Sequence, residues 1–316
     1  MTLVGLGLLL GLLLGPALQA AEDGGQPLAF SKLAVGARPA AMGGAFGAVG
    51  GDAYGMISNP SLLATLSDLR VGSQWASLPT GSSQQFLGFG RPFDVGDSTS
   101  YGMTYDRYAV DVPIEKRIAN TPDADSVFGD SSSILTADLA GWLSPHKLAL
   151  GASIKVLAET LGDASSGGFS FDAGLFMHTW DWLDLGLAFQ DAASHLTWNT
   201  GAEDNLPLVV RSSAAVHLCD DKLLFSTDVE KSEAQTLRLH LGAEVWAVPQ
   251  FLALRLGWNQ GQWSTGFGLR FPFFNLAKDV GLDYALASDP LGDLALQHRF
   301  SLNLGFGLES EVSAPH

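Results

Sequence analysis

Between residues 69 and 308 the sequence alternates apolar residues with polar or small ones at every second position. Successive side chains of a β-strand point to opposite faces, so this alternation predicts strands with one apolar and one polar face. In one clear example, Leu148, Leu150 and Ile154 share one face while Lys155 lies on the other. Breaks containing Gly, Asp, Pro and Ser divide the stretch into about fourteen segments.

The lengths of these breaks also constrain the fold. Most are short, whereas residues 108–132 form one long polar connection, and 192–206 and 287–296 are intermediate. Short turns that alternate with longer loops are typical of an outer-membrane β-barrel. The expected strands are 68–78, 84–92, 99–107, 133–143, 147–158, 167–178, 183–192, 206–218, 221–231, 236–247, 250–259, 262–271, 279–287 and 297–308.

Charged residues lie mainly on one face of the expected strands, and the opposite face is almost free of charge. A charge facing lipid at the middle of a membrane costs about 2–4 kcal/mol, so this asymmetry favours a lipid-facing apolar surface. Both signs occur on the polar face, which suits ion pairs around a plug or narrow lumen better than a charge-selective pore. The candidate inward positions are Asp106, Asp138, Lys155, Asp172, Arg211, Asp228, Glu230, Arg238, Glu244, Arg255, Arg270, Asp283 and Arg299.

Alternation alone leaves a second fold open. A soluble β-sandwich or a lipocalin-like barrel also has an apolar and a polar face, but turns the apolar face inward. Aromatic residues near the expected strand ends favour the membrane barrel, because aromatic girdles lie at membrane interfaces. These residues are Trp75, Phe89, Phe93, Trp142, Trp180, Trp182, Trp198, Trp246, Trp258 and Trp263.

Residues 1–20 contain no ionisable side chain, and they include an apolar run from Leu8 to Leu14. The small residues Ala17, Ala20 and Ala21 follow, so the segment reads as a cleaved secretory signal. No later run of about 18 apolar residues could form a membrane-spanning helix. The excess of 33 acidic over 17 basic residues argues against a nucleic-acid partner, which would need clustered positive charge.

Residues 29–65 lack the alternating pattern and are rich in small residues. Glycines permit close backbone packing and positive φ, and Asn59-Pro60 predicts a helix N-cap followed by proline at the first helical position. A flexible linker is the alternative, but the segment contains too many apolar residues for a polar spacer. We therefore expect short helical turns that pack compactly.

The run VGARPAAMGGAFGAVGGDAYGMISNPSLL at residues 35–63 resembles the N-terminus of FadL-like outer-membrane proteins of the PorV/PorQ type. The last expected strand, with residues 298–302 reading HRFSL, is similar to the ending of that family. The resemblance implies a fourteen-stranded bacterial outer-membrane barrel with its N-terminal segment folded as a hatch inside the lumen. Two departures are Ser61, where Ala is commoner, and a tail that continues to His316 without a terminal aromatic residue.

The predicted fold is therefore all-β, a transmembrane antiparallel barrel of about 14 strands with an N-terminal hatch of short helices and turns. The expected division is a signal peptide at 1–20, the hatch at 21–67, the barrel at 68–308 and a tail at 309–316. The resemblance assigns a hatch motif to Arg38, Gly43, Gly44, Asn59 and Pro60. Candidate ligand-binding residues in the hatch are Phe30, Leu33, Met42, Phe46 and Met56, since hydrophobic ligands are held by apolar and aromatic side chains.

Arg38 stands out because an arginine within a run of small residues is costly to bury unless it is paired. We predict that it contacts a barrel carboxylate such as Asp106, Asp138 or Asp172. The alternative is a solvent-exposed side chain at the periplasmic mouth.

No catalytic or cofactor motif is present: the sequence contains no G-x-S-x-G, HExxH or CxxC, and no glycine pair is followed by GK[ST]. We therefore expect no enzyme activity, cofactor or metal site. The first functional hypothesis is binding or passive transport of hydrophobic small molecules, with outer-membrane lipid around the barrel. The alternative is a protein-interaction or shuttle role in an outer-membrane secretion system of type IX, with 108–132 recognising cargo or secretion proteins. A structural barrel without a solute is a weaker third possibility.

Overall fold

The computed structural model describes residues 26–93, 98–118, 122–233, 236–273, 277–289 and 292–307. The expected signal peptide at 1–20 and the expected tail at 309–316 lie outside these residues. No helix in the described ranges is long and apolar enough to cross a membrane.

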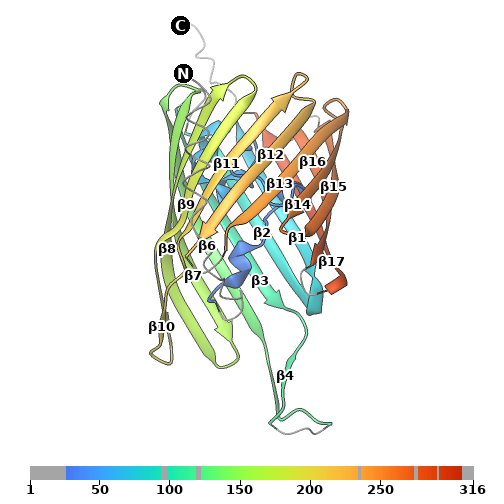
Figure 1. Cartoon of the computed structure of the whole chain (residues 1–316). Coiled ribbons are helices and arrows are strands. Elements are labelled where there is room, and N and C mark those ends of the chain that lie inside the picture. The colour runs from blue at the N-terminus through green and yellow to red at the C-terminus, as the bar shows by residue number, and fades with distance from the viewer. Residues whose placement is uncertain are drawn as a thin grey trace, which may run out of the picture.

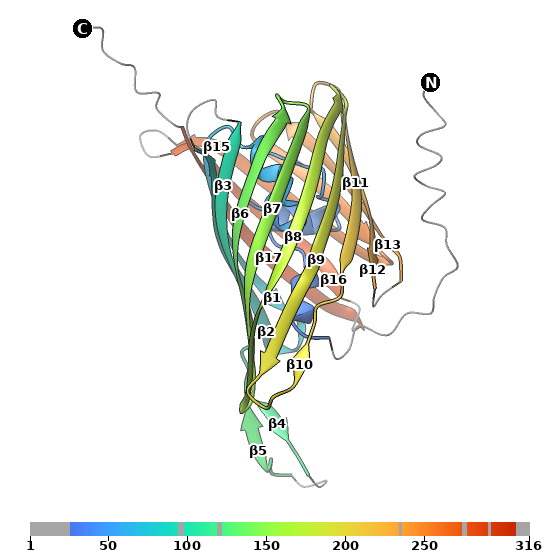
Figure 2. The same cartoon turned by 90° about the vertical axis from the view of Figure 1, so that its left-hand side faces the viewer.

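Fourteen strands form one closed antiparallel barrel, in which neighbours in sequence are neighbours in space (Figures 1 and 2). β1 pairs with β17 and β8 pairs with β9, so no edge of the barrel is left open. The barrel strands are β1 (Leu69–Leu78), β2 (Ser82–Pro92), β3 (Thr99–Val110), β6 (Asp130–Ser144), β7 (Leu148–Leu161), β8 (Ala164–Trp180), β9 (Leu183–Trp198), β11 (Val209–Leu218), β12 (Leu223–Ser232), β13 (Arg238–Val248), β14 (Leu252–Asn259), β15 (Gln262–Phe273), β16 (Ala277–Asp289) and β17 (Gly292–Phe306).

The predicted fold class is confirmed, and each of the fourteen expected segments overlaps one barrel strand. The expected end of the seventh strand at residue 192 is wrong, because β9 continues to Trp198. The connection at 108–132 is not simply polar coil. It contains a projecting hairpin of β4 (Ile114–Lys116) and β5 (Ser126–Phe128), while β10 (Glu203–Asp204) pairs with the end of β9.

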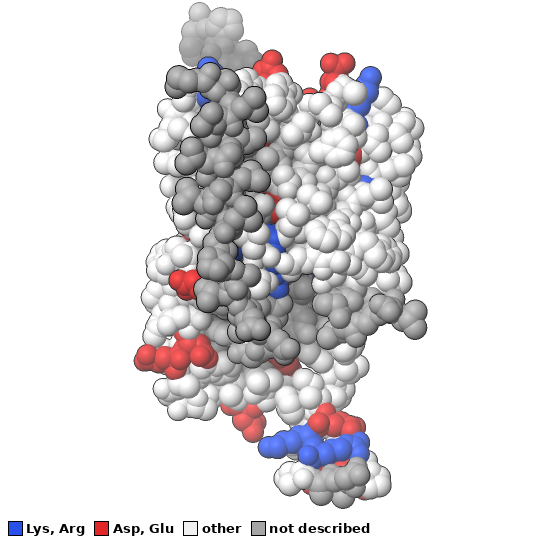
Figure 3. All heavy atoms as spheres, viewed as in Figure 1, with Lys and Arg blue, Asp and Glu red and all other residues white. Residues whose placement is uncertain are grey.

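Outward side chains of the barrel are apolar, and inward ones are mainly polar. Leu150 and Ile154 of β7 are 43% and 46% exposed, whereas Ser153 between them is buried. Figure 3 shows one face that is mostly white, with charged residues near its ends, on the β4–β5 hairpin and in a narrow group near the middle. This arrangement excludes the soluble sandwich or lipocalin-like alternative, because the apolar face is turned outward.

The two ends of the barrel differ in their connections. β1 begins and β17 ends at the end with short turns such as 145–147 and 219–222. The opposite end carries the β4–β5 hairpin and the connection around β10, and it lies at the bottom of Figure 1. Short periplasmic turns and longer extracellular loops are the rule for such barrels, so the hairpin marks the extracellular end.

Residues 28–66 lie inside the barrel, drawn in blue in Figures 1 and 2. The helical elements of this hatch are η1 (Ala29–Lys32), α2 (Ala37–Ala41), α3 (Gly55–Ser58) and η2 (Pro60–Thr65), and η3 (Pro79–Gly81) lies in a barrel turn. The Asn59 side chain accepts a hydrogen bond from the Ser61 amide, and Pro60 occupies the first position of η2. The local prediction for this pair is therefore confirmed.

Candidate functional site

Every barrel strand meets the hatch through a small inward residue or, in β12, an aspartate. This small-residue ring surrounds the hatch at a level between the two mouths, and its members touch residues between Ala37 and Leu66. From β1 onward the ring consists of Gly72, Gly90, Gly102, Ala140, Gly151, Gly174, Gly186, Ser213, Asp228, Gly242, Gly257, Gly266, Ala285 and Ser301.

The approach between hatch and wall is too close for larger side chains. A Cβ atom at Gly242 would stand 2.7 Å from the carbonyl oxygen of Met42, and one at Gly90 would stand 2.6 Å from a methyl group of Leu63. Gly43 has a φ of +66°, and a Cβ there would lie 2.6 Å from the Trp258 amide. Glycine therefore allows the hatch backbone to rest directly on the wall.

Buried hydrogen bonds also fix the hatch. The Asn59 side-chain amide donates to the carbonyl oxygens of Gly47 (3.0 Å) and Leu175 (3.1 Å), which ties two parts of the hatch to β8. Asp228 of β12 accepts hydrogen bonds from the amides of Phe46 and Gly47. Gly44 shares this contact region, because its carbonyl accepts a hydrogen bond from Arg211 and its Cα faces His240.

Arg38 contacts a barrel carboxylate, as predicted, but this is Glu244 of β13 and not Asp106, Asp138 or Asp172, and the exposed alternative is wrong. Its guanidinium donates two hydrogen bonds to Glu244 and one to Asp52, and its side chain is only 15% exposed. The reason is the course of the hatch: α2 lies against β14, β15, β16 and β17, on the far side of the lumen from β3, β6 and β8. The partner Glu244 is in turn held by the buried Arg255.

The five predicted ligand-binding residues do not meet in one pocket. Met42 and Phe46 pack together against β11 and β12, and Met56 packs in another cluster with η2. All three are at most 2% exposed and fill the space between hatch and wall. Phe30 and Leu33 lie together in a third cluster, toward the extracellular end.

That third group is the extracellular apolar cluster: Leu28, Phe30, Ile134, Leu157, Leu196 and Leu206, flanked by Leu33 and Tyr108. The Phe30 ring stacks on Tyr108 with ring centroids 5.8 Å apart. Ile134 and Leu157 stand opposite each other on β6 and β7, at positions whose side chains face the lumen. Here the inner wall presents an apolar surface, which the first residues of the hatch cover.

Sequence reasoning missed the wall side of this cluster. Ile134 is four residues from Asp138, and Leu157 is two residues from Lys155, so both share the polar face of their strands. A large apolar residue at a position predicted to face a polar lumen was the available signal. It marks a place where the interior itself is apolar.

Next to the cluster, the wall is irregular along β9. The pairing of β9 with β11 stops at Gln190, and its pairing with β8 is interrupted between Phe171 and Ala173. Asp191 has a φ of +56°, and its carboxylate pairs with Lys32 of η1 at 3.3 Å and with Lys155 at 3.0 Å. The first helical turn of the hatch is thus bound to the distorted strand.

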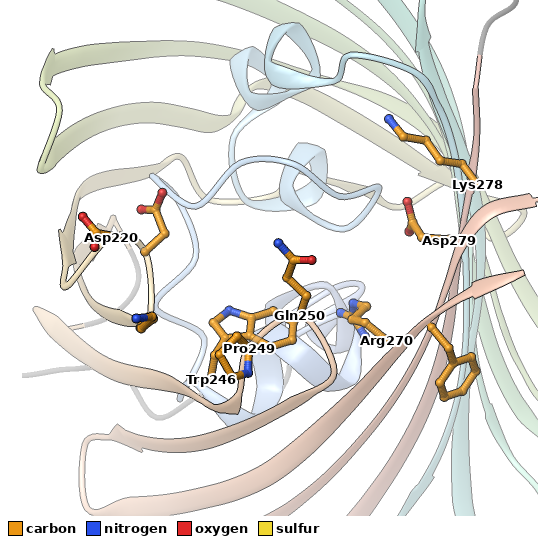
Figure 4. A pocket seen from close by; sticks show the side chains of 10 residues that line it. Asp220, Trp246, Pro249, Gln250, Arg270, Lys278 and Asp279 are labelled. Carbon is orange, nitrogen blue, oxygen red and sulfur yellow. The ribbon is translucent and has the colours of Figure 1, made fainter.

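A separate cavity of about 740 Å³ opens at the periplasmic end, on the other side of the small-residue ring. Trp246, Gln250 and Arg270 face this space, and Asp279 and Lys278 lie at its margin (Figure 4). Most of the residues that line it are charged or polar, in contrast to the extracellular apolar cluster.

Comparisons with known proteins identify the architecture. No family model and no curated protein matches the sequence. The fold is similar to the crystal structure of a Pseudomonas aeruginosa FadL homologue, at 12% identity and a TM-score of 0.57, covering 87% of this chain and 98% of that one. It is also similar to the Pseudomonas putida toluene transporter TodX, at 13% identity and a TM-score of 0.57, covering 85% and 96%.

The protein is a bacterial outer-membrane β-barrel with a FadL-like fold. The narrower PorV/PorQ assignment stays a prediction, as does the expectation that the chain is not an enzyme. Within the described part of this barrel, no group of three or more His, Cys, Asp or Glu side chains could hold a metal ion.

Proposed function

We propose that this outer-membrane barrel binds and passively transports hydrophobic small molecules, and that the extracellular apolar cluster is its ligand site. The observation that carries the proposal is the apolar inner wall at Ile134, Leu157 and Leu196, which Leu28 and Phe30 cover. An apolar wall is unfavourable in a lumen that holds only water and polar solutes, because apolar surface is more stable when it is removed from water. The same wall suits a lumen that holds hydrophobic molecules. The similarity to a toluene transporter supports the same substrate class.

A ligand can reach this surface only if residues 28–33 move away from it. The glycine-rich part of the hatch, from Gly43 to Gly51, is not the moving element in this proposal, because the small-residue ring holds it. The segment around η1 has fewer ties, chiefly the Lys32–Asp191 ion pair and the apolar contacts of Leu28 and Phe30.

The route onward from the site does not run along the barrel axis, because the hatch touches all fourteen strands. We place it beside β9, where pairing with β11 stops at Gln190 and pairing with β8 is interrupted. Few ladder hydrogen bonds need to break there for an apolar molecule to pass between lumen and lipid.

The test is native mass spectrometry with lipid extraction on protein purified from outer membranes in mild detergent. Co-purifying hydrocarbon or another apolar compound should be present in the native protein and lost from Leu157→Asn. Ser100→Asn is the matched control, because Ser100 is a buried residue of β3 that faces the lumen on the periplasmic side of the small-residue ring, outside the apolar cluster. Equal ligand content in all three proteins would contradict the proposed site.

The secretion alternative predicts a different result, an empty barrel that carries a stoichiometric protein partner. No contact or comparison described above favours it specifically, and the PorV-like role stays a prediction.

A further inference from the structure

A small cavity of about 40 Å³ lies directly on the periplasmic side of the extracellular apolar cluster. Lys32 and Met56 of the hatch cover it, and Ile134 belongs both to its wall and to the cluster. A single water needs about 10–15 Å³ measured in this way, so the space accepts a small polar group and not a whole ligand. The cavity thus lies at the periplasmic end of the proposed ligand site, and we call the cavity with its lining residues the floor of that site.

The wall changes from apolar to polar in successive rows toward this floor. Ile134 stands opposite Leu157, Thr136 opposite Lys155, and Asp138 opposite Ser153. From Ile134 to Asp138 the distance along β6 is about 13 Å, since a strand rises about 3.3 Å per residue. A molecule seated among the apolar residues would reach the floor with one end.

The floor carries more negative than positive groups. Its lining includes four carboxylates, Asp106, Asp138, Asp172 and Asp191, and two ammonium groups, Lys32 and Lys155, which gives a formal charge of 2 − 4 = −2. Charges interact strongly in a site that is shielded from water, so an anionic ligand group is disfavoured there.

The carboxylates of the aspartates differ in what they already bind. Asp172 and Asp191 both pair with Lys155, and Asp191 also pairs with Lys32. Both oxygens of Asp106 accept hydrogen bonds from Gln84. These three carboxylates are therefore occupied by the protein itself.

Asp138 is the exception. Its Oδ1 accepts a hydrogen bond from Ser153 at 2.5 Å, but Oδ2 has no partner among the described residues, although the residue is only 5% exposed. A buried acceptor without a donor is costly, and a donor placed beside it removes that cost.

Resting on the proposed function, we infer that the ligand is an apolar molecule that ends in a hydrogen-bond donor, a hydroxyl or an ammonium group, which Asp138 Oδ2 accepts. Its apolar part takes the place of Leu28 and Phe30 against Ile134 and Leu157. A fatty carboxylate fits this floor poorly, because it adds a negative charge and offers the Asp138 oxygen no proton.

The experiment uses four probes that share a phenyl ring and a four-carbon chain: butylbenzene, 4-phenylbutan-1-ol, 4-phenylbutylamine and 4-phenylbutyrate. Their binding to the full chain in detergent is measured by isothermal titration calorimetry. The alcohol and the amine should bind about tenfold more tightly than the hydrocarbon and the carboxylate, as expected when a buried acceptor that has no other donor gains a hydrogen bond.

Asp138→Leu should weaken binding of the alcohol about tenfold and leave the hydrocarbon within about twofold. Asp130→Leu is the matched control, because Asp130 lies on the same face of β6 at its extracellular end and is not part of the floor. Asp138→Asn keeps a carbonyl acceptor, and it should retain the alcohol while losing most of the preference for the amine. This variant carries the test if Asp138→Leu fails to form a barrel.

Three outcomes count against these conclusions in different ways. If hydrocarbon and carboxylate bind as tightly as the alcohol, the donor inference is overturned and the proposed function stands. The same holds if the preference survives Asp138→Leu. If none of the four probes binds, the proposed function is overturned together with the inference that rests on it.

Discussion

Arg38 of the hatch and Glu244 of β13 face each other through two hydrogen bonds, Nε to Oε2 and Nη2 to Oε1, both 2.8 Å long. The two residues are separated by 206 positions in the chain. This paired geometry is the strong form of an arginine–carboxylate contact, and it joins α2 to the barrel wall. Asp52 accepts a further hydrogen bond from the same guanidinium, so Arg38 also links two parts of the hatch to each other.

Breaking this pair should destabilise the protein. Glu244→Gln leaves Arg38 and Arg255 short of a carboxylate, and removing one partner of a buried ion pair costs about 3–5 kcal/mol. Urea unfolding monitored by tryptophan fluorescence measures the change. Arg117→Ala is the control: its ion pair with Glu115 is exposed, and its loss should change the free energy of unfolding by less than about 1 kcal/mol. Equal effects of the two variants would contradict the role given to Glu244.

Enlarging a ring residue should loosen the hatch. Gly242→Val places side-chain atoms where the Met42 carbonyl stands, and overpacking of this kind typically costs about 1–3 kcal/mol. We expect protease sites in the hatch to become accessible while the barrel remains folded. Gly129→Ala serves as the comparison, since a Cβ atom there meets nothing within 4 Å. A hatch as resistant in Gly242→Val as in Gly129→Ala would show that the close approach is unimportant.

Releasing η1 should favour ligand binding. Lys32→Met removes the ion pair with Asp191, while Asp191 keeps Lys155 as its partner. Because residues 28–33 compete with the ligand for the apolar wall, a weaker hold on them raises the population of the open form. We expect butylbenzene to bind several-fold more tightly to this variant, measured by calorimetry. Lys278→Met, which removes an ion pair with Asp68 at the other end of the barrel, should leave the affinity unchanged. Weaker binding to Lys32→Met would argue against competition.

Removing the projecting hairpin separates the two functional hypotheses. β4 and β5 form a sheet of their own that does not pair with the barrel. Replacing residues 112–128 with a short Gly-Ser linker should therefore preserve the folded barrel and its affinity for butylbenzene. Pull-down of outer-membrane proteins before and after the replacement checks the alternative. If the hairpin is a recognition surface for secretion partners, a stoichiometric partner will be lost; if ligand affinity falls instead, the hairpin contributes to the ligand site.

The barrel was predictable because its two faces meet different solvents. Lipid outside and polar groups inside impose a two-residue period that residues such as Leu150, Ser153 and Ile154 display directly. Asn59 and Pro60 were also readable, since a helix cap depends on neighbours in sequence. These features need no knowledge of which distant segments meet.

The partners of Arg38 were not predictable in the same way. The period shows that Glu244, Asp106, Asp138 and Asp172 all face the lumen, but not which side of the lumen α2 approaches. The proposed ligand site was also difficult to predict from the sequence. Ile134 and Leu157 interrupt the polar face of their strands, and without the course of η1 they read as irregularities in a pattern.

The small-residue ring has a consequence for the order of events during assembly. Residues 28–66 precede β1 in the chain, and the last strand, β17, pairs with β1 to complete the wall. A hatch that touches all fourteen strands, several of them at glycines with no room for a larger side chain, cannot be threaded through a finished cylinder. The barrel wall must therefore close around the hatch. The hatch, which is synthesised before the strands, is in place before β17 pairs with β1.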